Sequence, residues 1–249
     1  MNSSKYIIGF TALLTAFVAL VLSLMYTGLK EKHKQNELLF EKRAMLGAIQ
    51  DRAKLNVSDI KDADIIDFFN KNIEQVVVDT KGNILTPEDV EKHGYKGGKA
   101  ENVDMKKEMK KAFENRILPV YIYNDKNGEK IYILKLFGKG LWDEISGFLA
   151  LGPDINTVVG ASFDHKGETP GMGAEMKDNP KFPAQFKGKK IYDESGKLVS
   201  INVRKGGAVD PEHDVDAISG ATLTSNGITD MLKSSLENYN NYLKKLKQK

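Results

Sequence analysis

The segment Asp216–Ser225, DAISGATLTS, lies between a predicted loop and the last helical stretch of the chain. Small hydroxyl residues and a glycine at a helix start leave backbone N–H groups accessible, and the helix dipole adds partial positive charge there. This combination favours a bound phosphate. The alternative is an ordinary helix cap, because Ser, Thr and Asp gather at helix starts without any ligand. The residue pattern of this segment leaves both interpretations open.

Downstream of this segment, apolar residues recur at helical spacing and predict a long amphipathic C-terminal helix. Further helices are expected at about 30–50, 62–72 and 102–116. Upstream, β-branched and alternating residues predict strands at 74–79, 120–123, 130–137, 145–151, 157–164, 189–192 and 198–204. The second and third of these strands form a hairpin around Lys126-Asn127-Gly128, and the last two are joined through residues 193–197.

A second loop with many glycines follows the strand at 157–164. It is Asp164–Gly173, DHKGETPGMG. Glycine and proline let the backbone approach a flat ligand closely. A tight turn with a solvated glutamate is the alternative interpretation.

The N-terminal segment Tyr6–Leu29 contains no charged residue. Its length of roughly 24 residues spans about 36 Å as a helix, enough to cross a bilayer. It is longer than the apolar part of a signal peptide, and no cleavage site is evident after it. We therefore predict an uncleaved anchor. One lysine precedes the segment and three follow it closely, so the positive-inside rule would keep the body of the protein in the cytoplasm.

Composition excludes several other classes of protein. The 249 residues contain no cysteine, so a disulfide framework, an iron–sulfur cluster and a cysteine nucleophile are excluded on this chain. A net charge of +3 is too balanced for a broad nucleic-acid-binding face. Four separated histidines make a metal site unexpected.

Two motifs together point to a known family. Asp216, Ser219, Gly220, Ala221 and Thr222 match the sequence recognised by flavin transferases, which attach FMN through its phosphate to a threonine hydroxyl. The Glu-Thr-Pro-Gly-x-Gly element of the same flavin-domain family matches residues 168–173. Adjacent phrases extend the match: Gly140-Leu141-Trp142, residues 147–151 and residues 153–158.

The chain thus resembles the NqrC family, the C subunits of the sodium-translocating NADH:quinone oxidoreductase, most closely from residue 138 to about 225. The resemblance implies an α+β fold in which one transmembrane helix precedes a single FMN-binding domain with an antiparallel sheet and a long C-terminal helix. The expected parts are a tail (1–5), the transmembrane helix (6–29), a juxtamembrane and α/β elaboration (30–118) and the FMN-binding core (119–249).

The resemblance also implies the roles of individual residues. Thr222 is the expected site of covalent FMN attachment by a phosphoester, and no catalytic residue or metal is expected. The transferase is expected to recognise Asp216, Ser219, Gly220 and Ala221. Further FMN contacts are expected from Ser219, Gly220, Ala221, Thr224, Glu168, Thr169, Pro170, Gly171, Gly173 and Trp142.

The implied function is that of a membrane-anchored flavoprotein that relays electrons within a six-subunit sodium pump. Its partners would be the other subunits, the membrane and an FAD-dependent flavin transferase, and no nucleic acid. The transferase acts outside the cytoplasmic membrane, so the soluble domain is expected on the periplasmic side of the bacterial inner membrane. Two alternatives are an electron carrier like the G subunit of the Rnf complex and a membrane-anchored sensory or interaction domain of the FMN-binding superfamily.

Overall fold

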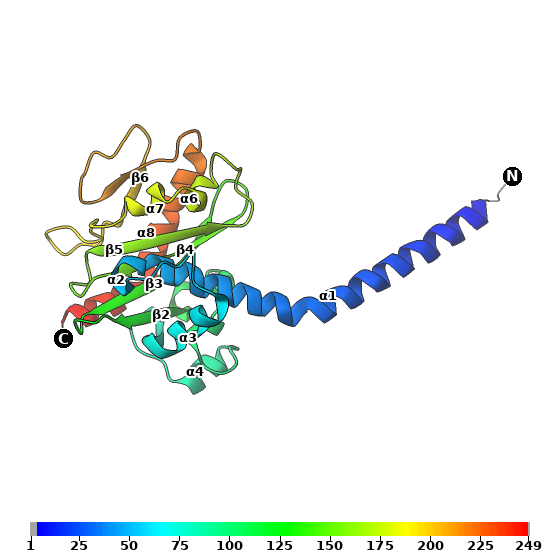
Figure 1. The fold of residues 1–249 in the computed structure, drawn as a ribbon, viewed down its shortest axis with the longest axis horizontal. Coiled ribbons are helices and arrows are strands. Elements are labelled where there is room, and N and C mark those ends of the chain that lie inside the picture. Colours follow the sequence, from blue (N-terminus) through cyan, green and yellow to red (C-terminus); the bar gives the residue numbers. More distant parts are fainter. Residues whose placement is uncertain (1–3, 249) are drawn as a thin grey trace. The chain divides into compact units, whose positions relative to one another are not determined.

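The computed structural model describes residues 4–248 and contains two compact units, one reaching to Glu41 and the other beginning at Lys42. The predicted α+β architecture is confirmed by one long apolar helix, a five-stranded antiparallel sheet and a long C-terminal helix (Figure 1). Residues 1–3 of the expected tail lie outside the described residues, and the first helix already begins at Ser4. The expected subdivision at residue 118 falls inside the second unit and stays a prediction.

The five strands of the sheet lie side by side in sequence order. They are β1 (Ile73–Asp79), β2 (Ile117–Asn124), β3 (Lys130–Lys139), β4 (Glu144–Leu151) and β5 (Val158–His165). All five correspond to strands predicted from the sequence, and the β2–β3 hairpin is confirmed by its register. Both faces of the sheet are buried, since β2 alone carries seven consecutive buried residues.

The first helix, α1 (Ser4–Ala48), contains the apolar segment predicted as a membrane anchor. Within residues 4–248 it is the one helix long and apolar enough to cross a membrane. Its last turn belongs to the second unit, where Met45 and Leu46 are buried. A Cβ on Gly160 of β5 would lie 2.2 Å from the Ala48 carbonyl oxygen, so a glycine is needed for this close approach of helix end to strand.

The C-terminal helix, α8 (Thr222–Lys247), packs on β3 and closes the main core, which confirms the predicted amphipathic helix. Two glycines let the backbones approach closely. A Cβ on Gly138 of β3 would lie 2.6 Å from Met231 Cβ, and a Cβ on Gly227 of α8 would lie 2.5 Å from the Lys139 carbonyl oxygen. The start of α8 is therefore held against the end of β3.

A tyrosine of α8 completes the sheet where a proline interrupts it. Pro119 of β2 has no N–H for the ladder, and the β2–β3 pairing begins at the next residue. The Tyr239 hydroxyl lies 2.9 Å from the Pro119 carbonyl oxygen and 3.1 Å from that of Lys135, and the ring is fully buried. This hydroxyl supplies the donor that proline lacks, which fixes α8 on the sheet.

The opposite face of the sheet is covered by the end of α1, by α2 (Gln50–Ala53) and by α3 (Asp62–Asn72). The structure places α3 at the residues predicted for it. An aromatic pair joins the layers: Tyr121 of β2 lies 6.0 Å from Phe69 of α3, and within the sheet it lies 6.1 Å from Phe148 of β4, both in edge-on geometry. Such pairs add about 0.5–1.5 kcal/mol to the burial of their area.

The helix predicted at 102–116 is wrong. The connection between β1 and β2 contains four short helices instead: α4 (Pro87–Lys92), η1 (Ala100–Asn102), α5 (Met105–Glu108) and η2 (Phe113–Asn115). The chain leaves the helical path after Glu108, whose fully buried carboxylate accepts the Ile117 N–H at 2.9 Å and the Tyr95 hydroxyl. A tertiary partner therefore overrides the weak local periodicity.

The strands predicted at 189–192 and 198–204 are largely wrong. Only Asn202–Arg204 is a strand (β6), and it pairs in parallel with β7 (Asp214–Asp216). The earlier residues form single bridges. Within 198–204, Ser200 adopts a left-handed φ of 66°, which breaks the extended backbone before β6. Two short helices, α6 (Glu175–Asp178) and α7 (Lys181–Ala184), lie between β5 and this region.

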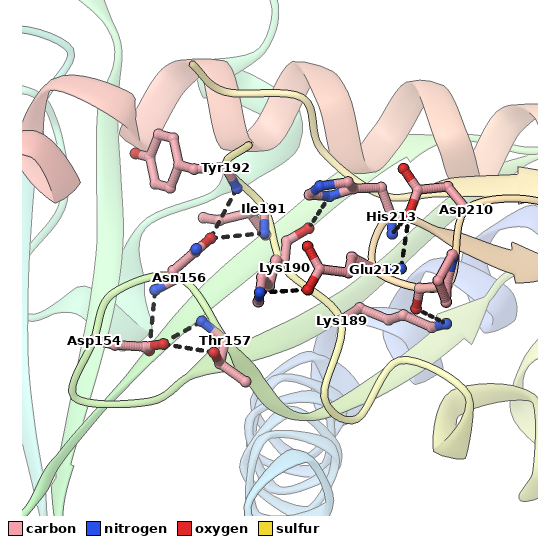
Figure 2. Close-up of polar contacts among 11 residues, drawn as sticks. Asp154, Asn156, Thr157, Lys189, Lys190, Ile191, Tyr192, Asp210, Glu212 and His213 are labelled. Atoms are coloured by element: carbon pink, nitrogen blue, oxygen red, sulfur yellow. Dashed lines mark hydrogen bonds and ion pairs between the residues drawn. The ribbon is translucent and has the colours of Figure 1, made fainter. Parts of the chain in front are cut away.

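Side-chain hydrogen bonds add to isolated backbone bonds around residues 189–192 (Figure 2). The Asn156 side-chain oxygen accepts the N–H groups of Ile191 at 3.1 Å and Tyr192 at 2.8 Å. On the other side, His213 Nδ1 lies 2.7 Å from the Lys190 carbonyl oxygen, and Lys190 pairs with Glu212. The segment is thus held between the β4–β5 turn and the β6–β7 loop.

Candidate functional site

The candidate site lies at the first turn of α8, which begins at Thr222. The first N–H groups of an α-helix have no acceptor within the helix. In the described chain the residue before the helix is Ala221, no side chain caps the turn, and no acidic residue lies in it. The helix-cap alternative left open by the sequence is therefore wrong, and the N–H groups and the positive dipole end remain available to an anion.

The three hydroxyl groups of this turn differ in availability. Thr224 and Ser225 are each only 1% exposed. The Thr224 hydroxyl donates to Glu168 at 2.6 Å, and the Ser225 oxygen accepts the Ile218 N–H at 3.1 Å. Thr222 is partly exposed, and its hydroxyl has no partner within residues 4–248. Thr222 is therefore the accessible, unengaged hydroxyl of the first turn.

A tight turn leads into the helix. The Ala221 N–H donates to the Ile218 carbonyl at 3.1 Å, and Gly220 has a φ of 73°. A positive φ confined to the third position of a four-residue turn is typical of type II, which requires glycine there. The turn leaves Ser219 and Gly220 exposed beside Thr222. Asp216 is exposed too, and its carboxylate accepts the Ala208 N–H at 2.7 Å.

The loop after β5 forms a second turn of the same kind. The Met172 N–H donates to the Thr169 carbonyl at 3.1 Å, with Pro170 and Gly171 at the two central positions. Gly171 has a φ of 71°, while proline presets the φ of the position before it. The Glu-Thr-Pro-Gly string therefore encodes a turn, and this turn leaves Thr169, Pro170 and Gly171 exposed.

Glu168 lies beneath the site and joins its segments. Its carboxylate is buried and accepts both the Thr224 hydroxyl and, at 3.1 Å, the Trp142 backbone N–H. A Cβ on either Gly140 or Gly173 would lie 2.3 Å from one of its oxygens. The Trp142 side chain is 66% exposed, and its indole N–H donates to the Thr169 hydroxyl at 3.2 Å.

A cleft of about 440 Å³ adjoins the turn before α8. It is lined by Gly171, Glu175, Asn179, Lys181, Phe182, Gln185, Ala217, Ile218 and Ser219. Polar side chains and one aromatic ring therefore surround a space large enough for a small organic group.

The structure brings the two sequence motifs together. Ser219 and Gly171 share the cleft, while Glu168 and Thr224 face each other beneath it. Glu168 and Thr224 thus point at each other rather than outward, and their expected direct contacts with a cofactor stay predictions. The sequence analysis placed Gly140 in a matching motif with Trp142 but did not predict it as a site residue. No motif in the sequence indicated that the cleft residues on α7 and just before it belong to the site.

Comparison with known proteins agrees with this geometry. The family model of the FMN-binding domain matches residues 140–237. The C subunit of the Na(+)-translocating NADH-quinone reductase of Pasteurella multocida strain Pm70 is 33% identical over 262 residues, which cover 99% of this chain and 97% of that protein. The same protein of Neisseria meningitidis serogroup B is 40% identical over 176 residues, covering 68% of this chain and 67% of that protein.

Solved structures give the same result. The crystal structure of the C subunit of the Na(+)-translocating NADH-quinone reductase from Parabacteroides distasonis has a TM-score of 0.71 and 33% identity, covering 86% of this chain and 96% of that one. The crystal structure of Shewanella oneidensis NqrC has a TM-score of 0.65 and 26% identity, covering 84% of this chain and 99% of that one.

The fold and the site define an FMN-binding-domain flavoprotein with an apolar N-terminal helix. Within that class, the chain belongs to the NqrC family, the C subunits of the Na⁺-translocating NADH-quinone reductase. It is accordingly a subunit of an NADH:quinone oxidoreductase.

Proposed function

We propose that Thr222 carries FMN as a phosphoester and that the chain relays electrons between redox centres of the reductase. The observation that supports this assignment most directly is the availability of hydroxyls on α8. Thr222 offers an unengaged oxygen at an uncapped helix start, whereas Thr224 and Ser225 are buried and hydrogen-bonded. A phosphate on Thr222 would lie where the helix dipole and free N–H groups stabilise its charge.

The surrounding residues fit the rest of such a group. Ser219 and Gly220 flank the acceptor on an exposed turn and would hold the phosphate. The exposed ring of Trp142 and the turn at Thr169–Gly171 offer apolar and backbone surface to a flat ring system. FMN supplies the electron-transfer chemistry when bound, while these residues orient it and tune its surroundings.

No residue beside Thr222 need act as a base in the mature protein, because a separate enzyme would supply the chemistry of attachment. We assign this step to an FAD-dependent flavin transferase that reads Asp216 and the Ser219–Ala221 turn; the Thr222 oxygen would bond to the FMN phosphate of FAD, and AMP and the hydroxyl proton would leave. Asp216, Ser219 and Gly220 are exposed, which supports recognition from outside. Transferase action also requires the domain to be extracytoplasmic, so we place residues after the anchor on the periplasmic side. A domain of this size is translocated largely regardless of a few lysines near the anchor.

The proposal is tested by a matched pair of variants, Thr222→Val and Thr224→Val, produced with a flavin transferase in a host that exports them. Both substitutions replace a hydroxyl by a methyl group of similar size. We expect Thr222→Val to fold and lack covalent flavin. Thr224→Val should keep the flavin fluorescence after denaturing electrophoresis, because a covalent bond survives loss of the fold. Peptide mapping that finds flavin on Thr224 or Ser225, or covalent flavin in Thr222→Val, would refute the assignment.

A further inference from the structure

Glu168 is a buried carboxylate that three segments of the site surround. It is 5% exposed, and the described part of the chain gives it no ion pair. One oxygen accepts the Thr224 hydroxyl on α8 at 2.6 Å, and the other accepts the Trp142 backbone N–H at 3.1 Å. Its own N–H donates to His165 Nδ1 at 3.2 Å, which fixes the loop that carries it.

The residues that pack around the carboxylate leave space for it in this position. Gly140 precedes Trp142 in one segment, and Gly173 follows Glu168 in another. A Cβ at either position would lie 2.3 Å from a carboxylate oxygen, and at Gly173 also 2.7 Å from the Thr224 hydroxyl. Both glycines therefore leave room for the same carboxylate. Burying a carboxylate without an ion pair costs free energy of folding. We therefore expect such a carboxylate only where its hydrogen bonds are needed.

We propose that Glu168 is the positioning residue of the flavin site, and that its carboxylate links the Trp142 loop to the first turn of α8. The proposal deepens the assignment of FMN to Thr222 and rests on it only for its electrostatic part. Through this link, a substitution at Thr224 changes the mobility of Trp142, although no hydrogen bond joins those two residues directly. A negative charge on Glu168, set among the segments that would surround the flavin, would also oppose its reduction.

The mechanical part is tested without any flavin. Trp142 is the only tryptophan, so fluorescence anisotropy of the full chain in detergent, produced without a flavin transferase, reports its mobility. Glu168→Ala should lower the anisotropy, and so should Thr224→Val, which leaves the carboxylate in place but releases it from α8. Asp178→Asn, which changes an exposed carboxylate on α6, should match the wild type. Wild-type anisotropy in both Glu168→Ala and Thr224→Val would overturn the proposal.

The electrostatic part uses the flavin-loaded full chain. Glu168→Gln removes the charge at nearly constant volume and should raise the midpoint potential of the flavin. A tenfold change in the one-electron equilibrium corresponds to about 59 mV, and we expect a shift of about threefold to tenfold. An unchanged potential in Glu168→Gln would overturn this part. If the wild-type chain takes up no covalent flavin, the assignment of Thr222 fails, while the anisotropy measurement still decides the role of Glu168. If Glu168→Ala does not fold, Thr224→Val decides it.

Discussion

Gly227 of α8 allows a prediction whose sign is opposite to that expected from helix propensity. Replacing glycine by alanine within a helix normally stabilises it, by up to about 1 kcal/mol. At Gly227 the added Cβ would lie 2.5 Å from the Lys139 carbonyl oxygen and 3.2 Å from Gly140 Cα. Both atoms belong to the backbone, so no side chain can rotate away.

The magnitude follows from the two opposing terms. Overpacking of this kind costs about 1–3 kcal/mol. Subtracting a propensity gain of about 1 kcal/mol leaves Gly227→Ala destabilised by up to about 2 kcal/mol. The helix can relieve the contact only by moving away from the end of β3, which would also displace Thr222 from the Trp142 loop. We therefore expect less covalent flavin in this variant along with the lower stability.

The control for this prediction is Gly47→Ala, at a helical glycine in the last turn of α1 with no atom within 4 Å of the added Cβ. It should range from neutral to about 1 kcal/mol more stable. Urea unfolding of the full chain in detergent, followed by circular dichroism, measures both variants. Equal or greater stability of Gly227→Ala relative to wild type would show that α8 does not press on β3 as described.

Three further predictions concern the fold. Tyr239→Phe should cost about 1–3 kcal/mol in unfolding free energy, because it removes the donor that replaces the missing N–H of Pro119; a loss below about 0.5 kcal/mol, the effect of a neutral surface change, would contradict this. Burial alone would raise the pKa of Asp214, but hydrogen bonds from the Asp210 backbone and the Arg204 side chain outweigh it and lower the pKa to about 2. This depressed pKa contributes about 2 kcal/mol above pH 5, which is lost as the pH falls towards 2, so the stability difference between wild type and Asp214→Asn should shrink over that range in urea titrations. Residues 30–249 should stay in solution without detergent, and their sedimentation with lipid vesicles would reveal a second membrane-binding surface.

Local patterns in the sequence predicted the elements that local interactions determine. The helix Asp62–Asn72 and the β2–β3 hairpin depend on periodicity and turn residues that lie within a few positions of each other. The predicted helix at 102–116 failed because Glu108 bonds to Tyr95 and Ile117, whose contacts depend on the folded core. A buried partner of this kind leaves no periodic signal.

The same distinction applies to the site. The turn at Thr169–Gly171 and the start of α8 near Thr222 could be predicted from short strings, because each is a local structure with its own residue requirements. The attachment role of Thr222 stays a prediction. The link through Glu168 could not, since it joins residues 26 and 56 positions apart. In the sequence, only Gly140 and Gly173 reflect this link, and a glycine alone does not indicate which neighbouring side chain requires it.

The distribution of hydroxyls on α8 bears on when the flavin is attached. In an unfolded chain Thr222, Thr224 and Ser225 would all be accessible, so selection among them would depend on the order of neighbouring residues alone. In the folded chain, hydrogen bonds and burial remove two of the three. If the flavin is attached to the folded domain, Thr222 would be selected by two criteria: the sequence motif and the accessibility of its hydroxyl. Because Glu168 accepts the Thr224 hydroxyl, the residue that we propose to position the site would also restrict where the proposed phosphoester can form.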